Sequence, residues 1–275
     1  MQQLESVTPP ETSDLIFDVG SHKGEDSDFY LKLGYRVVAI EAHPTLVQDL
    51  KKRFSDEINS GRYRLVDKAI GESEETITFY INKQVSVWGT ANPKWAKRNE
   101  GLGTESEEIE VQSVRFSDVV TKYGCPYYLK IDVEGADMLC VDALQDLECR
   151  PKYISIESSK TSWSDLLNEF NALEKLGYTR FAVVDQKAHK SGEFRNRSGQ
   201  LISYSFVEGA SGPFGEQINA VWLTKKQAIC RYLPIFFLYK TIGDNTFLPK
   251  ILRRLPIIRR ILEFETWYDT HAMRV

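Results

Sequence analysis

The chain lacks most of the features that would commit it to an unusual class of protein. No apolar run approaches the roughly 18 residues that a membrane-spanning helix needs. The formal net charge is only −4, from 39 acidic and 35 basic residues in 275, so nothing in the overall charge favours a nucleic-acid partner. Apolar residues make up 42% and charged residues 27% of the chain, which excludes a disordered or fibrous protein.

Cysteine is scarce and widely spaced. The four cysteines, Cys125, Cys140, Cys149 and Cys230, form no C-x-x-C pair, which argues against a structural zinc site. The same spacing argues against a disulfide framework and favours a reducing compartment. The N-terminal residues are polar and contain no apolar core of signal-peptide length, so we expect a cytoplasmic protein.

Short β-branched runs alternate with helical patterns from residue 14 to about residue 185, which is typical of a parallel sheet covered on both faces. Helices are expected from Pro44 onward and over Ser164–Leu176. The expected strands are Asp14–Val19, Arg36–Glu41, Tyr63–Val66, Thr76–Ile81, Ile109–Val114, Pro126–Val133, Lys152–Glu157, Tyr178–Val184 and, last, Asn219–Leu223. These patterns predict an α/β fold.

Composition divides the chain into three parts. We expect a flexible N-terminus over residues 1–13, a main domain over residues 14–224 and a C-terminal extension over residues 225–275. Two polar stretches of the main domain, 82–108 and 186–217, are long enough to be functional loops. They carry aromatic and basic side chains suited to contact a bound small molecule, namely Trp88, Trp95, Phe194, Arg195, Arg197 and Phe214.

The most informative motif is a strand, Leu15–Val19, that runs into a turn bounded by Gly20 and Gly24. Glycine tolerates positive φ and lets a ligand approach the backbone closely. The next strand ends on Glu41, where a carboxylate can accept hydrogen bonds from ribose hydroxyls. The combination predicts a site for a nucleoside cofactor.

The turn also indicates which cofactor. A dinucleotide site uses G-x-G-x-x-G, and its middle glycine is absent here, where Ser21, His22 and Lys23 separate the two glycines. Asp18, two residues before Gly20, suits an ammonium group better than an anion. Because S-adenosylmethionine carries an ammonium group and no phosphate, the spacing favours it over NAD.

A second buried strand, Tyr128–Val133, breaks at Gly135 and leaves Asp132 and Glu134 at its carboxyl end. The following strand ends on Glu157. Ligands of open α/β sheets bind at this edge. The carboxylates gathered there could steer a substrate, accept a proton or hold a divalent cation.

The strings DVGSHKG and LKIDVEGAD, with the intervening VVAIEAHP and DKAIGE, resemble the FkbM family of S-adenosylmethionine-dependent methyltransferases over about residues 14 to 160. The resemblance implies a class I methyltransferase fold, a Rossmann-like, mostly parallel seven-stranded sheet with helices on both faces. It also implies methyl transfer from S-adenosyl-L-methionine, most often to an oxygen of a sugar, a polyketide or another small molecule.

The resemblance further implies roles for single residues. Around the cofactor it places Asp18, Gly20, Ser21 and Gly24 at the methionine end, Glu41 at the ribose, Asp67, Lys68 and Ala69 at the adenine, and Asp132 beside the methyl group. Family members often have a small residue followed by Asn in the turn, whereas this chain has Ser21 and His22. His22 is therefore either a cofactor contact or a residue closer to the chemistry.

Three side chains are candidates for removing a proton from the acceptor: His22, Glu134 and Glu157. Removal by solvent after the transfer is the alternative. Mg²⁺ held by the acids at the sheet edge would be another way to align a hydroxyl. Since a sulfonium is already a good methyl donor and positioning supplies most of the acceleration, we expect no metal.

Two rival functions make different demands on the sequence. An NAD-dependent reductase would need a glycine-rich pyrophosphate turn and a Tyr-x-x-x-Lys pair, and the chain has neither. A non-catalytic nucleoside-binding or scaffold protein on the same fold would be expected to have a damaged cofactor site, whereas both glycines and Glu41 are present.

The C-terminal extension carries Arg253, Arg254, Arg259 and Arg260 among isoleucines and leucines, a composition that could lie on an anionic membrane surface. Pro249 and Pro256 interrupt it and disfavour a long surface helix. We expect the extension to pack on the catalytic domain or on a second subunit instead.

Overall fold

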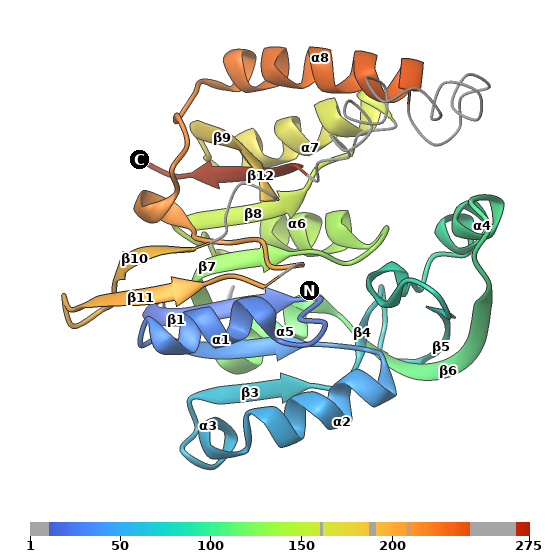
Figure 1. Ribbon diagram of the computed structural model, residues 1–275, viewed down its shortest axis with the longest axis horizontal. Coiled ribbons are helices and arrows are strands. Elements are labelled where there is room, and N and C mark those ends of the chain that lie inside the picture. Colours follow the sequence, from blue (N-terminus) through green and yellow to red (C-terminus); the bar gives the residue numbers. More distant parts are fainter. Residues whose placement is uncertain (1–10, 160–161, 187–190, 208, 243–267) are drawn as a thin grey trace, which may run out of the picture.

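Seven strands form the central sheet of the computed structural model, which describes residues 11–159, 162–186, 191–207, 209–242 and 268–275 (Figure 1). Their order is β3-β2-β1-β7-β8-β12-β9. The strands are β1 (Glu11–Val19), β2 (Arg36–Ile40), β3 (Tyr63–Val66), β7 (Cys125–Ile131), β8 (Tyr153–Glu157), β9 (Arg180–Asp185) and β12 (Tyr268–Met273). All neighbours pair in parallel except β12, which is antiparallel to both β8 and β9. The predicted mostly parallel seven-stranded fold is confirmed.

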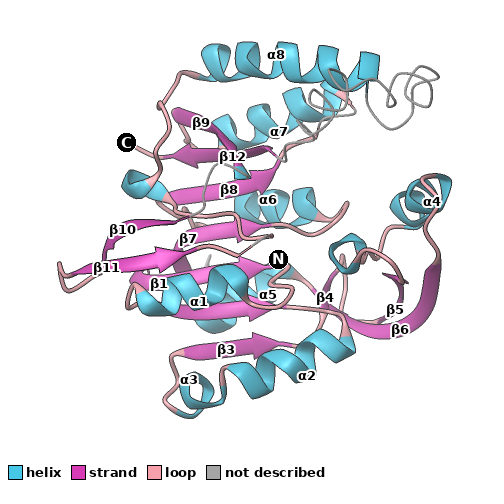
Figure 2. Cartoon of the chain, in the orientation of Figure 1, coloured by secondary structure: helices cyan, strands magenta, loops and turns pink. Residues whose placement is uncertain are grey.

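Helices cover both faces of this sheet (Figure 2). Alternate residues of β1 point to opposite faces, so Phe17 packs with α5 (Phe116–Tyr123), α6 (Asp137–Asp146) and α7 (Trp163–Lys175). Ile16 packs on the other face with α1 (Glu25–Lys32), α2 (Pro44–Arg53) and the residues just after α2. A short α3 (Ser55–Asn59) follows α2. Burial on both faces explains why these strands are near-continuous apolar runs.

A smaller sheet stands beside the carboxyl ends of the parallel strands and is built from β4 (Ala69–Ile70), β5 (Thr76–Asn82) and β6 (Ser106–Val114) (Figure 1). Between β5 and β6 lie the 3₁₀ turn η1 (Ser86–Trp88) and α4 (Pro93–Gly101). We call residues 76–114 the arm. The stretch 82–108, expected as a loop, is therefore largely structured. It begins at the last residue of β5 and ends within β6.

The C-terminal part of the chain corrects one strand prediction and adds a strand that was not predicted. Residues Asn219–Leu223 form no strand, and within them Leu223 makes only an isolated bridge to Phe181. The sheet is completed instead by β12, which follows α8 (Lys225–Ile242) and the undescribed residues 243–267. Because β12 lies between β8 and β9, the main domain does not end at residue 224. Its sequence, Tyr-Asp-Thr-His-Ala-Met, lacks the apolar run that identified the other strands.

Hydrogen bonds between buried hydroxyl groups help to position β12. Ser158 lies 2.5 Å from Thr270, and Tyr232 of α8 lies 2.7 Å from the same Thr270 hydroxyl. Glu169 of α7 accepts a 2.5 Å hydrogen bond from Ser158. These contacts, rather than an apolar pattern, hold the strand at the centre of this half of the sheet.

Two further expectations are corrected at the edges of the chain. Residues 11–13, expected to be flexible, belong to β1. Cys125 and Cys149, expected to be reduced, form a disulfide with a Cα–Cα distance of 5.3 Å. The fold brings together cysteines that are 24 residues apart in sequence, which spacing alone could not reveal. This disulfide runs against the expectation of a reducing compartment.

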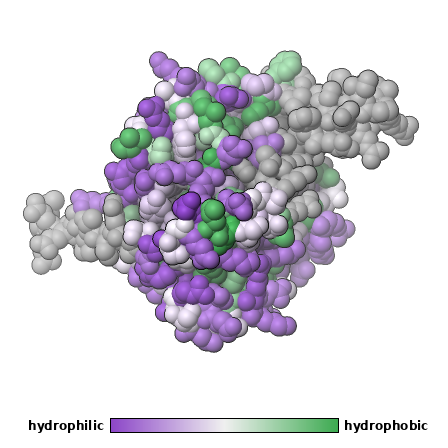
Figure 3. Space-filling model, turned by 60° about the vertical axis from the view of Figure 1, so that its left-hand side comes forward, coloured by the Kyte–Doolittle hydropathy of each residue, from purple (hydrophilic) through white to green (hydrophobic). Residues whose placement is uncertain are grey.

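The surface is mostly hydrophilic on the face that Figure 3 shows, with apolar side chains in small separate patches. Among the described residues, the most exposed large apolar side chains are Leu201, Val207, Val221, Leu233, Phe237 and Val275. No helix in the described part of the chain has both the length and the apolar composition needed to cross a bilayer. The arginines 253–260 lie outside the described residues.

Candidate active site

An open cavity of about 880 Å³, its mouth included, lies where the parallel strands end and the arm begins. It is lined by the turn after β1, the ends of β2 and β7, the start of β4 and the arm. The lining residues used below are Gly20, Ser21, His22, Glu25, Asp26, Glu41, Lys68, Ala69, Ser86, Thr90, Lys130, Asp132, Glu134 and Gly209.

Gly20 is the point where the turn after β1 meets the turn after β7. Its φ is +78°, and a Cβ built there would lie 1.8 Å from the carbonyl oxygen of Asp132. The amides of Gly20 and Ser21 both donate to the Ile40 carbonyl, at 3.0 and 3.1 Å. No side chain fits at residue 20, because the backbone of the second turn already fills that space.

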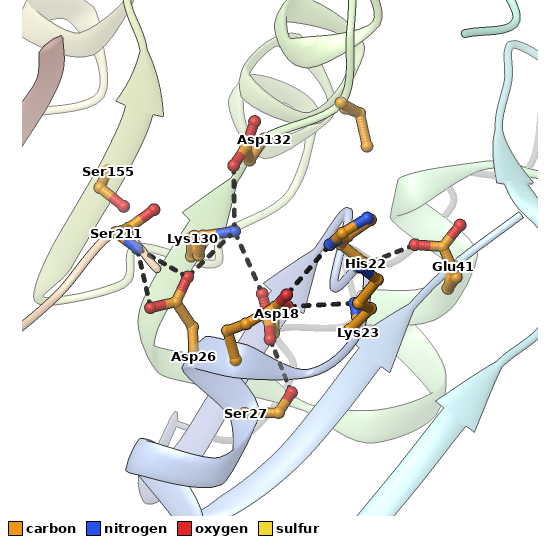
Figure 4. Close-up of polar contacts among 12 residues, drawn as sticks. Asp18, His22, Lys23, Asp26, Ser27, Glu41, Lys130, Asp132, Ser155 and Ser211 are labelled. Atoms are coloured by element: carbon orange, nitrogen blue, oxygen red, sulfur yellow. Dashed lines mark hydrogen bonds and ion pairs between the residues drawn. The ribbon is translucent and has the colours of Figure 1, made fainter. Parts of the chain in front are cut away.

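Glu41 joins the first turn to the end of β2. Its carboxylate accepts a hydrogen bond from the His22 amide at 2.9 Å (Figure 4). It accepts a second from the His43 amide at 2.8 Å. Burial raises the pKa of Glu41, while the two amide donors and nearby His22 oppose that shift. Each carboxylate oxygen keeps a second acceptor position, so the group can still bind hydroxyls from the cavity.

Lys130, which sequence reasoning missed, is the centre of the charge cluster below the cavity. Its ammonium lies 3.5 Å from Asp18, 3.5 Å from Asp26 and 3.2 Å from Asp132 (Figure 4). Lys130 sits opposite Asp18 in the pairing of β1 with β7, so the two side chains share one face of the sheet. The sequence signal was a lysine inside an otherwise apolar strand, a position that requires charged partners.

The cluster is buried, with Lys130 only 4% exposed and Asp18 fully enclosed. Burial alone would lower the pKa of Lys130, but Asp132, Asp18 and Asp26 raise it well above its ordinary value. Burial raises the pKa of Asp26 to about 6, against the opposing effect of Lys130. Asp26 also accepts hydrogen bonds from the amides of Ser211 and Gly212, which ties the 209–215 segment to α1.

Acidic side chains crowd the turn after β7. Burial raises the pKa of Glu134 well above its ordinary value, and repulsion from Glu157 and Asp132 adds to the shift. Asp137 accepts a 3.1 Å hydrogen bond from the Val133 amide, and burial raises its pKa to about 8. The carboxyl groups of Glu134 and Asp137 therefore hold protons at pH values where an exposed acid has lost them.

The arm closes over this second turn. Thr90 donates a 2.5 Å hydrogen bond to the Glu134 carbonyl, and Asn92 donates to the Gly135 carbonyl at 3.4 Å. Trp95 covers Gly135, where a Cβ would lie 2.4 Å from the indole ring. Trp95 thus helps to dock the arm, whereas Ser86 and Thr90 face the cavity.

The structure brings most of the predicted site residues together. Gly20, Ser21, His22, Glu41, Lys68, Ala69, Asp132 and Glu134 line the cavity. Four predicted residues do not line it. Asp18 lies behind Lys130, Gly24 faces Phe54, Glu157 ends β8 beside Asp269, and Asp67 pairs with Lys51 at the surface.

The stretch 186–217 contributes less than expected. Of its described residues only Gly209 lines the cavity. Its strands β10 (Ser191–Arg195) and β11 (Leu201–Ser205) form a hairpin against α1, where Phe194 meets Phe29 with 5.0 Å between ring centroids. Phe214 stacks on Tyr128 at 4.2 Å. These aromatic side chains serve the core because α1 leaves that part of the sheet face open.

Among the described residues, no group of three or more His, Cys, Asp or Glu side chains is arranged to hold a metal ion. The acids at the sheet edge are instead occupied with Lys130, with backbone amides and with one another.

A search of solved structures finds methyltransferases that are similar to part of this chain. A methyltransferase FkbM from Methylobacillus flagellatus KT is 16% identical with a TM-score of 0.39, and the match covers 72% of this chain and 44% of that chain. A precorrin-6y C5,15-methyltransferase from Geobacter metallireducens GS-15 is 12% identical with a TM-score of 0.37, covering 71% and 77%. The 1,6-didemethyltoxoflavin-N1-methyltransferase of Burkholderia thailandensis, solved with S-adenosylhomocysteine, is 14% identical with a TM-score of 0.30, covering 68% and 66%.

A comparison with curated proteins finds no significant match. The comparison with family models is decisive, because the methyltransferase FkbM domain matches residues 18–180, more than half of the chain. That range begins at Asp18 and contains both turns of the cavity, Glu41 and the whole arm. The chain belongs to the FkbM family of S-adenosylmethionine-dependent methyltransferases.

Proposed function

We propose that this methyltransferase moves a methyl group from S-adenosylmethionine to a hydroxyl group of a small molecule, such as a sugar or a polyketide. The observation that carries the proposal is the continuity of the cavity, which runs from the glycine turn and Glu41 directly to the arm. The part of the cavity beside the glycine turn and Glu41 thus has the features of a cofactor site. The adjoining part is lined by the arm, to which we assign no cofactor contact other than Phe79, and it is available to the acceptor.

The residues present fit the cofactor. Gly20 and Ser21 bring the backbone of the first turn to the cavity wall, and Glu41 keeps acceptor positions for ribose hydroxyls. Lys68, Ala69 and the apolar side chains of Ile70 and Phe79 would flank the adenine. The Asp132 side chain is 33% exposed and reaches the cavity, whereas Asp18 does not. We therefore assign Asp132 to the end of the cofactor that carries the ammonium and methyl groups.

When bound, the cofactor supplies an electrophilic methyl group on a positively charged sulfur. The protein's task is to hold an acceptor oxygen in line with that group and to remove its proton. His22 and Glu134 both reach the cavity, but the raised pKa of Glu134 favours its protonated form, so His22 is the better candidate base. Glu157 does not line it, and its contribution is to raise the pKa of Glu134.

Calorimetric titration with S-adenosylhomocysteine and, separately, with NAD tests the proposal. We expect micromolar binding of the first and none of the second. Glu41→Ala should weaken S-adenosylhomocysteine binding about tenfold or more, since a charged hydrogen-bond partner is worth about 1.5–3 kcal/mol. Asp49→Ala, an exposed acid on α2, is the matched control. Unchanged affinity for S-adenosylhomocysteine in Glu41→Ala would overturn the ribose assignment. If the wild-type protein did not bind S-adenosylhomocysteine at all, a non-catalytic protein would be favoured.

A further inference from the structure

His22 has an unusual backbone conformation that the surrounding residues enforce. Its φ of +48° makes it the one non-glycine residue with positive φ in the described part of the chain. The Glu41 carboxylate holds its amide at 2.9 Å. Strained conformations of this kind persist where neighbouring contacts over-determine them, and they cluster at functional sites. The consequence is a side chain that projects from the cofactor turn toward the arm.

Glu25 determines which nitrogen of the His22 ring carries the proton. Its carboxylate lies 3.2 Å from Nδ1 and also accepts a hydrogen bond from the Lys23 amide at 3.1 Å. Burial alone would raise the pKa of Glu25, but the hydrogen bond from His22 and backbone hydrogen bonding lower it overall. An ionised carboxylate can only accept, so Nδ1 must be the donor. In the neutral ring Nε2 is then left without a proton.

Ser86 of the arm occupies the free side of the ring. Its Oγ lies 2.9 Å from Nε2, across 64 residues of sequence. Since Nε2 is an acceptor, the serine hydroxyl is the donor. Both residues line the cavity, and Ser86 is exposed to it. The structure therefore already shows a hydroxyl group donating to this nitrogen at the place where the arm meets the cofactor turn.

We propose that Glu25 is a positioning residue that fixes the His22 tautomer, and that Ser86 occupies the position of the acceptor's hydroxyl group at Nε2. This inference rests on the methyl transfer proposed above and narrows its acceptor to a group that arrives as a neutral O–H. During transfer the acceptor hydroxyl takes Ser86's place. Its oxygen forms a bond to the methyl carbon while the carbon–sulfur bond breaks, and its proton passes to Nε2. Glu25 stabilises the imidazolium until the proton leaves to solvent.

The test is ¹⁵N NMR of the histidine side chains of the whole protein, with and without saturating S-adenosylhomocysteine. The His22 signals are identified by their loss in His22→Asn. We expect the neutral His22 ring to carry its proton on Nδ1, the less common form for a free imidazole. Glu25→Ala should shift it toward the Nε2-protonated form. Glu25→Gln keeps an oxygen acceptor, so in this variant the ring should carry its proton on Nδ1, as in the wild type.

Two controls separate the roles. Ser86→Ala should move the Nε2 resonance toward that of an acceptor without a donor, while the proton stays on Nδ1. Asp28→Ala removes a carboxylate from the same helix that pairs with Lys32 and should leave the His22 signals unchanged. A wild-type ring protonated on Nε2, or no response to Glu25→Ala, would overturn the positioning role. An unmoved Nε2 resonance in Ser86→Ala would overturn the assignment of Ser86. The NMR results do not depend on the calorimetric titration, which tests whether the cofactor binds. Failure of this inference can therefore be told apart from failure of the proposed function.

Discussion

The turn after β1 and the turn after β7 both follow a buried strand, contain a glycine with positive φ, lie close to acidic side chains and line the same cavity. They differ in how their acids are stabilised. Beside the first turn, Glu41 accepts from the His22 and His43 amides, which oppose the rise in its pKa that burial causes, and the pKa of Glu25 is lowered overall. The second crowds acids together, so burial and mutual repulsion raise the pKa of Glu134.

The comparison shows how one sequence pattern, an acid and a glycine after a strand, serves two electrostatic purposes. Donors from the chain favour the charged form of a carboxyl group, whereas burial and neighbouring acids favour the neutral form. The first turn is therefore suited to fix geometry and to stabilise positive charge on His22. The second is suited to hold a proton close to the acceptor. Lys130 and Gly20 connect the two turns.

The largest effect should come from removing the charge that the turns share. Lys130→Met leaves Asp18, Asp26 and Asp132 without their cation, and breaking a buried ion pair in this way costs about 3–5 kcal/mol of unfolding free energy. Denaturant unfolding near pH 7 measures it. Adding Asp18→Asn should recover part of the loss, and Lys52→Met at the surface is the control. A loss below about 1 kcal/mol would show that the cluster is not held by Lys130.

Gly20→Ala should separate the turns sterically. The new Cβ would lie 1.8 Å from the Asp132 carbonyl oxygen in a backbone conformation that alanine disfavours. Strain and overpacking together should cost about 3 kcal/mol and abolish S-adenosylhomocysteine binding. Gly101→Ala, at the end of α4 with nothing within 4 Å, is the matched control and should be neutral or stabilising. Equal stability of the two variants would contradict the close approach.

Asp137→Asn sharpens the comparison at the second turn. The pKa of Asp137 is raised to about 8, so its stabilising contribution is complete below the unfolded value near 3.8 and is lost as pH rises through 8. Asparagine keeps the oxygen that accepts from Val133 but does not titrate. The variant should therefore gain stability relative to wild type between about pH 4 and 8, by more than about 1.4 kcal/mol, the equivalent of one pKa unit. A gap that does not change with pH would refute the raised pKa.

Glu25→Gln at the first turn should show the opposite sign and the smallest effect. Because the pKa of Glu25 is lowered, its contribution is present above the unfolded value near 4.5 and is lost as pH falls through the folded value. The variant should be less stable than wild type by about 1 kcal/mol near pH 7 and equal to it in acid. Unfolding curves over a pH series decide the sign, and a difference that grows toward low pH would contradict it.

Local patterns identified the parts of the fold whose environment is uniform. The strand at Tyr63–Val66 begins and ends where expected, and β1, β2 and β7 were found because both faces of each are buried and their residues are therefore apolar. Glycines with positive φ identified the two turns for a similar reason, since few other residues adopt that conformation. Residues 82–108 of the arm were expected to form a loop near the site, but their docking through Thr90 and Asn92 was not predicted.

The sequence alone identified the parallel strands, the glycine turn of the cofactor site and the acid at the end of β2. Each of these features depends on residues that are close together in the chain. Only the tertiary structure decided the rest. Thr270 becomes part of a core strand through the hydroxyls of Ser158, just after β8, and of Tyr232 on α8. Lys130 is stabilised by acids from β1, from α1 and from the turn after its own strand, and Ser86 meets His22 across 64 residues. The role of a buried polar side chain depends on the groups that it pairs with, and partners distant in sequence become neighbours only when the chain has folded.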